Sequence, residues 1–172
     1  DPLVMRRTVR QALAAGVSLG AHPSFPDLQG FGRRAMQLPA AEIEAMLIYQ
    51  IGALAGMAQA EGGRLTHVKP HGALNNMACE NAALAGSVVA AIKSFDPALI
   101  LLAPALSQLL LAGAAAGLPV VAEVFADRSY TDTGKLVPRS QPGAVLHNAD
   151  ACVEQVLRML DAGGIVSLSG QL

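Results

Sequence analysis

Several classes of residue are scarce in this chain, and each scarcity excludes a class of protein. Charged residues make up 15% of the 172 positions and aromatic residues 3%, with no tryptophan and a formal net charge of −1. Nucleic-acid-binding proteins carry clusters of basic residues, and the sequence has none, so we expect no nucleic-acid partner. No uninterrupted apolar run reaches the roughly 18 residues that span a membrane, so we expect no membrane partner.

Cysteine is also scarce. The chain contains only Cys79 and Cys152, whose spacing matches no metal-binding motif. They read as the reduced thiols of a cytoplasmic protein, although two cysteines are enough for one disulfide. No secretory signal pattern is present. We therefore expect a cytoplasmic location.

Apolar residues are abundant, at 52% of the chain, and they fall in helical and strand-like segments that alternate. Gly, Pro and capping residues divide these segments. Helices are predicted at 2–15, 39–61, 80–94, 104–116 and 148–162. Strands are predicted at 17–22, 64–69, 98–103, 119–125 and 165–166. Loops are predicted at 23–38 and 126–147.

This alternation predicts an α/β fold with a parallel sheet and right-handed crossovers, formed by a single domain over residues 1–172. The order begins with a helix and ends with a strand, and the chain does not begin with Met. A complete α/β domain normally begins with a strand. We therefore expect strands of the domain to be missing at one or both ends.

Ionisable residues gather where the predicted strands end, which is where ligands bind in parallel α/β folds. His22 ends the first predicted strand, His67 and Lys69 lie in the second, and His71 comes just after it. Strand alternation places Leu65, His67 and Lys69 on one face. This pattern favours a site, but a buried histidine bonded to backbone beside a snorkelling lysine would give the same sequence.

Other candidates are more ambiguous. Glu123 lies in an apolar run and needs a partner, for which Lys69 is suitable; the pair could be structural or could tune the lysine. Asp27 reads as a site residue or a turn former. Arg33 and Arg34 could bind a carboxylate or phosphate, or could simply be solvated. His22 and His71 are the residues best suited to hold a metal, if one binds.

Three motifs together resemble the LamB/YcsF family. They are Gly20-Ala21-His22-Pro23-Ser24-Phe25-Pro26-Asp27 with Gly30-Phe31-Gly32-Arg33-Arg34, then His67-Val68-Lys69-Pro70-His71-Gly72-Ala73-Leu74, then Glu123-Val124-Phe125-Ala126-Asp127-Arg128. The resemblance runs through nearly the whole chain in order. It implies an irregular (β/α) TIM-like barrel, similar to the seven-stranded glycoside hydrolase and deacetylase barrels.

The resemblance also implies a function, namely that of the A subunit of the ATP-dependent 5-oxoprolinase. This enzyme opens the lactam ring of 5-oxo-L-proline to L-glutamate together with partner subunits B and C. ATP could bind this chain or a partner. The implied catalytic residues are His22, His67, Lys69, His71 and Glu123, and the implied substrate-binding residues are Asp27, Arg33, Arg34, Asp127 and Arg128.

The sequence departs from the family at both ends. Family members begin with a strand bearing an Asn-Cys-Asp-Leu-Gly-Glu-like motif and end with a strand carrying His-Gly-Asp, and neither motif is present here. We therefore expect the barrel to lack its first and last strands in this chain. Two other functions stay open: a metal-dependent deacetylase-like hydrolase, and a non-catalytic subunit that only binds substrate.

Overall fold

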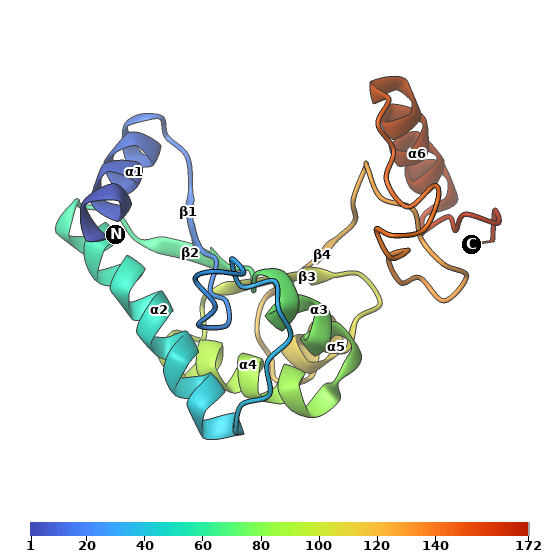
Figure 1. Ribbon diagram of the computed structural model, residues 1–172. Helices are drawn as coiled ribbons and strands as arrows, with labels where there is room; N and C mark the ends of the chain where they lie inside the picture. Colours follow the sequence, from blue (N-terminus) through green and yellow to red (C-terminus); the bar gives the residue numbers. More distant parts are fainter. Residues whose placement is uncertain (172) are drawn as a thin grey trace. The chain divides into compact units, whose positions relative to one another are not determined.

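The computed structural model describes residues 1–171, and the chain divides into two compact units, Asp1–Ala122 and Glu123–Leu172 (Figure 1). The elements of the first unit, with β4 reaching the unit boundary, are α1 Pro2–Ala14, β1 Leu19–Ala21, α2 Ala40–Ala60, β2 Leu65–Val68, α3 Gly72–Glu80, α4 Ala82–Phe95, β3 Ile100–Pro104, α5 Gln108–Ala115 and β4 Val120–Glu123. The helix of the second unit is α6 Ala149–Ala162.

The strands form one sheet in the order β1-β2-β3-β4. β1 pairs with β2, and β2 with β3, in parallel register, with Gly20 opposite His67 and Val68 opposite Leu101. This arrangement confirms the predicted α/β class and parallel sheet. Closure into a single barrel domain stays a prediction.

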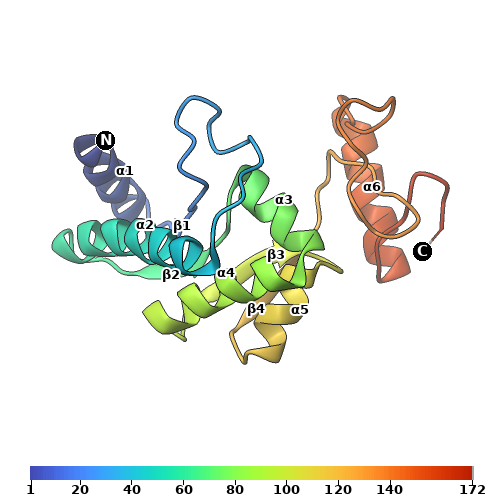
Figure 2. The ribbon, with the colours of Figure 1, turned by 60° about the horizontal axis from the view of Figure 1, so that its bottom comes forward.

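An apolar core lies between the sheet and its helices. α2 packs against α4, and α4 against α5, so the three helices lie side by side (Figure 2). Leu47 and Ile51 keep the helical spacing predicted for α2 and are fully buried, as is Val68 of β2. Burying such side chains contributes roughly 1.5–3 kcal/mol each, which makes this core the main source of stability in the first unit.

Side-chain caps place several helix boundaries. The Asp1 side chain caps α1 and the Asn148 side chain caps α6, at the starts of the helices predicted at 2–15 and 148–162. The helix predicted from residue 104 begins only at Gln108, because β3 extends to Pro104 and Ser107 accepts the N–H of Leu110 at 3.1 Å. No helix among the described residues is long and apolar enough to cross a bilayer.

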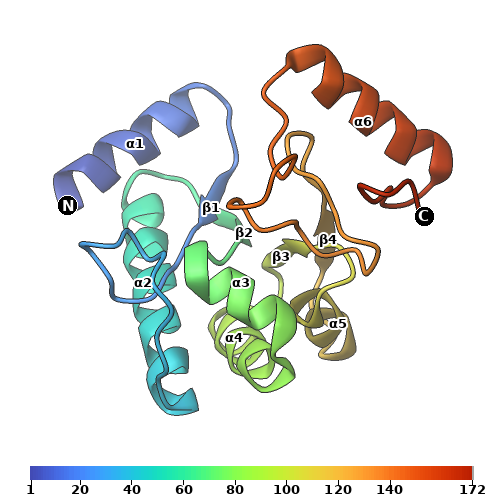
Figure 3. The same cartoon turned by 45° about the vertical axis from the view of Figure 1, so that its right-hand side comes forward.

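Helix α3 is absent from the sequence prediction, which starts a helix only at residue 80. α3 follows the end of β2 and lies against α4 (Figure 3). No side chain caps its N-terminus. Instead, the N–H of Ala73 donates to the carbonyl of Gly32 at 2.9 Å. This hydrogen-bond partner lies in the loop after β1, far away in the sequence. The residues next to α3 therefore contain no capping pattern from which the start of the helix could be predicted.

The strand predicted at 165–166 is wrong. Residues 165–166 have no strand structure, and the chain turns directly after them, where the N–H of Ser167 donates to the carbonyl of Gln171 at 2.8 Å. The N–H of Leu168 donates to the carbonyl of Tyr130 at 2.7 Å. The segment therefore packs against the long loop of its own unit.

The predicted loop at 126–147 is confirmed, with only two isolated antiparallel bridges, Arg128–Val145 and Tyr130–Leu136, among the described residues. Buried polar groups hold it. The Arg128 guanidinium donates to the carbonyls of Ala144 at 3.2 Å and Val137 at 2.6 Å. Burial also lowers the pKa of Arg128 and raises the pKa of the Tyr130 hydroxyl, which accepts the N–H of Phe125.

Candidate active site

The carboxyl ends of β1 and β2 stay in register beyond the strands themselves. The N–H of Lys69 donates to the carbonyl of Ala21 at 2.9 Å, and the N–H of His71 donates to that of Pro23 at 2.8 Å. The segment after β1 and the segment after β2 therefore run side by side. This register brings two of the predicted site residues, His22 and His71, into contact.

His22 and His71, hereafter the histidine pair, make a continuous chain of ring contacts. Nδ1 of His22 lies 2.5 Å from the carbonyl oxygen of Lys69. Nε2 of His22 lies 3.0 Å from Nδ1 of His71, and Nε2 of His71 lies 2.9 Å from the carbonyl oxygen of Phe31. The rings meet edge to face, with centroids 4.7 Å apart and planes at 67°.

A strained turn in the loop after β1 places the Phe31 carbonyl within hydrogen-bond distance of His71. Phe31 and Gly32 both have left-handed backbones, with φ of 55° and 68°. Such a conformation costs a non-glycine residue about 1–3 kcal/mol, so other contacts must hold it. The Phe31 ring supplies one, since it stands edge to face with His71 at 5.2 Å. The glycine-rich segment thus supports the histidine pair and α3 through its backbone carbonyls.

Asp27 stabilises the same loop. Its buried carboxylate accepts the N–H of Gly30 at 2.9 Å and of Arg34 at 3.3 Å, and it forms an ion pair with the Arg34 guanidinium, whose Nε lies at 2.9 Å. The hydrogen bond from Arg34 is the main cause that lowers the pKa of Asp27 to about 2. Asp27 and Arg34 therefore neutralise each other. Arg33 instead lies over the Phe31 ring, at 5.6 Å from its centroid.

The hydrogen bond of the His67 ring is to Thr66 and not to the histidine pair. This ring lies against β1: a Cβ on Gly20 would fall 2.0 Å from Nε2 of His67, so any larger residue there would have to displace the ring. The Thr66 hydroxyl has one hydrogen, which it donates to the carbonyl of Leu19 at 3.1 Å. It therefore accepts from Nδ1 of His67 at 2.8 Å. This arrangement is similar to the alternative that the sequence left open, in which hydrogen bonding gives a histidine of this strand a structural role.

The remaining predicted residues belong to, or border on, the second unit. Glu123 ends β4 half-buried, Asp127 is exposed, and Arg128 is buried with its guanidinium on loop carbonyls. These hydrogen bonds show that the Arg128 guanidinium stabilises the loop of the second unit. The catalytic role of Glu123 and the substrate-binding roles of Asp127 and Arg128 stay predictions.

A cavity of about 400 Å³ lies beside the histidine pair. His22 lines it, together with Asp1 and with residues of α1 and α2 that include Met5, Tyr49, Gln50 and Leu54. The sequence prediction assigns no site residue to α2. Gln50 nevertheless positions the loop, since its amide accepts the N–H of Ser24 at 3.0 Å and donates to the carbonyl of Ser24 at 2.8 Å. The sequence signal that could have identified Gln50 is the presence of a glutamine within a strongly apolar helix.

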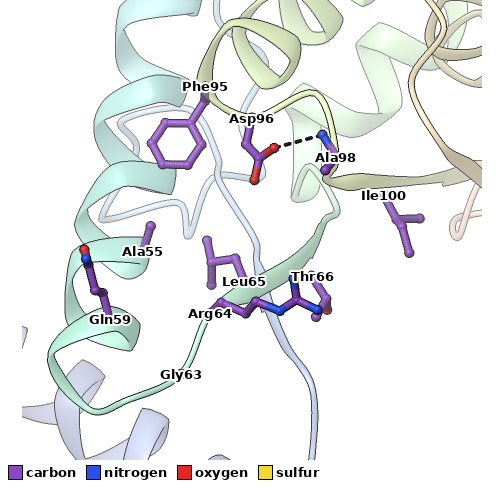
Figure 4. A pocket seen from close by; sticks show the side chains of 10 residues that line it. All are labelled: Ala55, Gln59, Gly63, Arg64, Leu65, Thr66, Phe95, Asp96, Ala98 and Ile100. Atoms are coloured by element: carbon purple, nitrogen blue, oxygen red, sulfur yellow. Dashed lines mark hydrogen bonds between the residues drawn. The ribbon is translucent and has the colours of Figure 1, made fainter.

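A second cavity, of about 530 Å³, lies at the opposite end of the strands (Figure 4). Arg64 and Leu65 at the start of β2, and Phe95 and Asp96 at the end of α4, are among its lining residues. None of the predicted site residues lines it. The predicted chemistry and this cavity are therefore separate.

Each ring nitrogen of the histidine pair lies within hydrogen-bond distance of a partner. Two of its four ring nitrogens face backbone carbonyls, and the other two face each other. Within residues 1–171, no group of three His, Cys, Asp or Glu side chains is placed to hold a metal ion. Whether a divalent metal binds His22 and His71 stays open, as it was from the sequence.

Known proteins match the whole chain. The model of the LamB/YcsF family matches residues 1–172. A protein of Azoarcus sp., named as the A subunit of 5-oxoprolinase, is 67% identical over 172 residues, covering 100% of this chain and 67% of the relative. A Rhodopseudomonas palustris protein that bears the same name is 52% identical over 173 residues, covering 100% of this chain and 68% of the relative.

A solved structure is also similar. The lactam utilization protein from Thermus thermophilus superposes with a TM-score of 0.92 at 43% identity, covering 98% of this chain and 68% of that one. The chain thus spans about two thirds of the length of these proteins.

Proposed function

Because this chain belongs to the LamB/YcsF family, we propose that it acts as the A subunit of a 5-oxoprolinase, which opens the lactam of 5-oxo-L-proline to L-glutamate at the expense of ATP. The observation that carries the proposal is the match, over the whole chain, to relatives that are named as the A subunit of 5-oxoprolinase. The name of the Thermus structure, a lactam utilization protein, agrees with it.

The reaction needs more than this chain. A lactam is a poor electrophile, so its oxygen must be activated before water attacks, and phosphorylation by ATP would supply that activation. The word subunit in the relatives' names supports a complex. We propose that partner subunits B and C complete it and bind the ATP.

The carboxyl ends of β1 and β2 are the proposed reaction site. The histidine pair lies there beside a cavity large enough for a five-membered lactam. Lys69, which follows the end of β2, supplies a cation for the developing negative charge, and His67 and Glu123 are the further acid–base candidates. Arg33 stacks on Phe31 and forms no ion pair with a described residue, so it suits substrate binding.

The test is glutamate formation by the full-length protein with its partner subunits. The complete mixture should form glutamate from 5-oxoproline and ATP, and leaving this protein out should abolish it. Failure of the complete mixture to turn over would reject the function.

A lysine variant tests the proposed site within that assay. Lys69→Met should lower kcat by about 100-fold, the usual cost of removing one charge-stabilising group. Lys93→Met is the matched control, because Lys93 is exposed near the end of α4 and donates to the carbonyl of Ala116. If Lys69→Met keeps full kcat, Lys69 has no part in the chemistry and a purely substrate-binding role for this protein gains support.

A further inference from the structure

The second cavity is lined by two opposite charges that do not pair with each other. Arg64 lines it directly before β2, and Asp96 lines it at the end of α4. Neither side chain forms an ion pair within residues 1–171. They are also the only charged residues among the described residues that line the cavity, so its lining has no net charge.

The Asp96 end of the cavity favours a cation. Oδ1 of Asp96 accepts the N–H of Ala98 at 2.8 Å, and Oδ2 accepts no hydrogen bond from a described residue. Asp96 is also the C-cap of α4, where the helix dipole already places partial negative charge. Lys93, in the last turn of α4, is bonded elsewhere, to the carbonyl of Ala116 at 2.7 Å. The Phe95 ring lies beside Asp96 on the cavity wall, and aromatic ring faces attract cations (Figure 4).

The Arg64 end of the cavity favours an anion. A guanidinium presents a planar fork of N–H donors that matches the two oxygens of a carboxylate. Arg64 is exposed, so a ligand can reach it from solvent. In Figure 4 its side chain crosses the cavity below Leu65, and the Asp96 carboxylate points into the same space from above. One small ligand with a charge of each sign can therefore meet both residues.

Apolar side chains line the cavity between the two charges. Ala55 comes from α2, Leu65 from β2 and Ile100 from β3. A volume of about 530 Å³ with mostly apolar walls and a few polar groups is typical of a site for a small molecule. An apolar group of the ligand would be removed from water against these walls, which favours binding.

We propose that the second cavity binds a free α-amino acid with an apolar side chain. Its carboxylate lies on Arg64, its ammonium on Asp96, and its side chain against Leu65 and Ile100. The proposal rests on the charges and walls of this cavity and not on the proposed function. 5-Oxoproline does not fit the site, because its ring nitrogen is an amide and carries no positive charge.

Three ligands separate the contributions of the two charges. L-Leucine carries both, 4-methylpentanoate lacks the ammonium, and 3-methylbutylamine lacks the carboxylate. In a ligand-detected NMR titration of the full-length protein, leucine should bind about tenfold more tightly than either analogue, because each missing charge removes a charge-assisted hydrogen bond. Failure of leucine to bind at about 10 mM would overturn the proposal. Tighter binding of L-glutamate than of leucine would overturn it too, since the walls would then not select an apolar side chain.

Two variants assign each charge to its residue. Arg64→Met keeps a long side chain without the charge, and Asp96→Asn keeps an acceptor for the N–H of Ala98. Each should raise the dissociation constant for leucine about tenfold. Arg64→Met should leave the binding of 3-methylbutylamine unchanged, and Asp96→Asn that of 4-methylpentanoate.

Arg7→Met is the matched control, because Arg7 is exposed on α1, and it should bind all three ligands like the wild type. A variant that weakens leucine and the unaffected analogue equally would show a structural effect in place of charge recognition. That result, or unchanged leucine binding in Arg64→Met or Asp96→Asn, would contradict the proposal.

Discussion

The two units of this chain are held by different kinds of interaction. In the first, side chains such as Leu47, Val68 and Leu101 are fully buried in an apolar core. In the second, buried Arg128 and Gln155 bond backbone carbonyls of an irregular loop. The apolar core leaves a periodic trace in the sequence, whereas the polar scaffold joins residues far apart and leaves almost none.

The largest effect should come from a cavity in the core of the first unit. Leu101→Ala removes a fully buried side chain of β3 and should lower the free energy of unfolding by about 3 kcal/mol. Leu111→Ala is the control, because Leu111 of α5 is 57% exposed and its loss should cost less than about 0.5 kcal/mol. Urea denaturation measures both, and equal losses would show that the core is not where the stability of this unit lies.

A polar substitution should have the next largest effect, in the second unit. Nε2 of Gln155 lies 2.8 Å from the carbonyl of Arg128 and 3.0 Å from the carbonyls of Phe125 and Ala126. Gln155→Leu leaves these acceptors without that donor and should cost about 2 kcal/mol.

Hydrogen exchange can locate that cost. Amides of residues 125–147 should exchange faster in Gln155→Leu, while those of β2 and β3 keep their protection. Gln59→Leu, at an exposed position of α2, provides the matched control. Unchanged exchange in the loop would mean that something other than Gln155 orders it.

The smallest effect should appear in the acid stability of the loop beside the histidine pair. Arg34 holds the pKa of Asp27 at about 2, below its ordinary 3.8. The carboxylate therefore contributes stability that is complete above about pH 4 and is lost as pH falls through about 2. Asp27→Asn should flatten this part of the stability curve, which urea midpoints at the two pH values would detect. An equally steep fall in the variant would assign the acid loss to other groups.

Much of the first unit could be predicted from sequence. Apolar periodicity identifies α2, and short β-branched or aliphatic runs between glycines and prolines identify β1 to β4. Helix α3, which the sequence prediction misses, depends on the Gly32 carbonyl, and the start of α5 depends on the extension of β3, so neither could be predicted from the local sequence. The run at 165–166 is apolar like a strand, yet the residues after it bond to Tyr130 and within a turn.

The candidate site was predictable in position but not in detail. Strand ends correctly indicate that His22 and His71 lie near each other. Strand parity alone pairs His67 with Lys69, but the ring of His67 lies against Gly20, and the hydrogen-bonded partner of His22 is His71. The pairing of Asp27 with Arg34 and the support from Gln50 depend on how the loop folds back, which no spacing rule encodes.

The carboxyl ends of β1 and β2 are central to the proposed function, because the substrate must bind there. A crystal structure of the full-length protein with 5-oxoproline bound tests this most directly. We expect the lactam in the cavity lined by His22, at the carboxyl ends of β1 and β2. A lactam bound instead in the cavity lined by Arg64 and Asp96, with none beside the histidine pair, would contradict it.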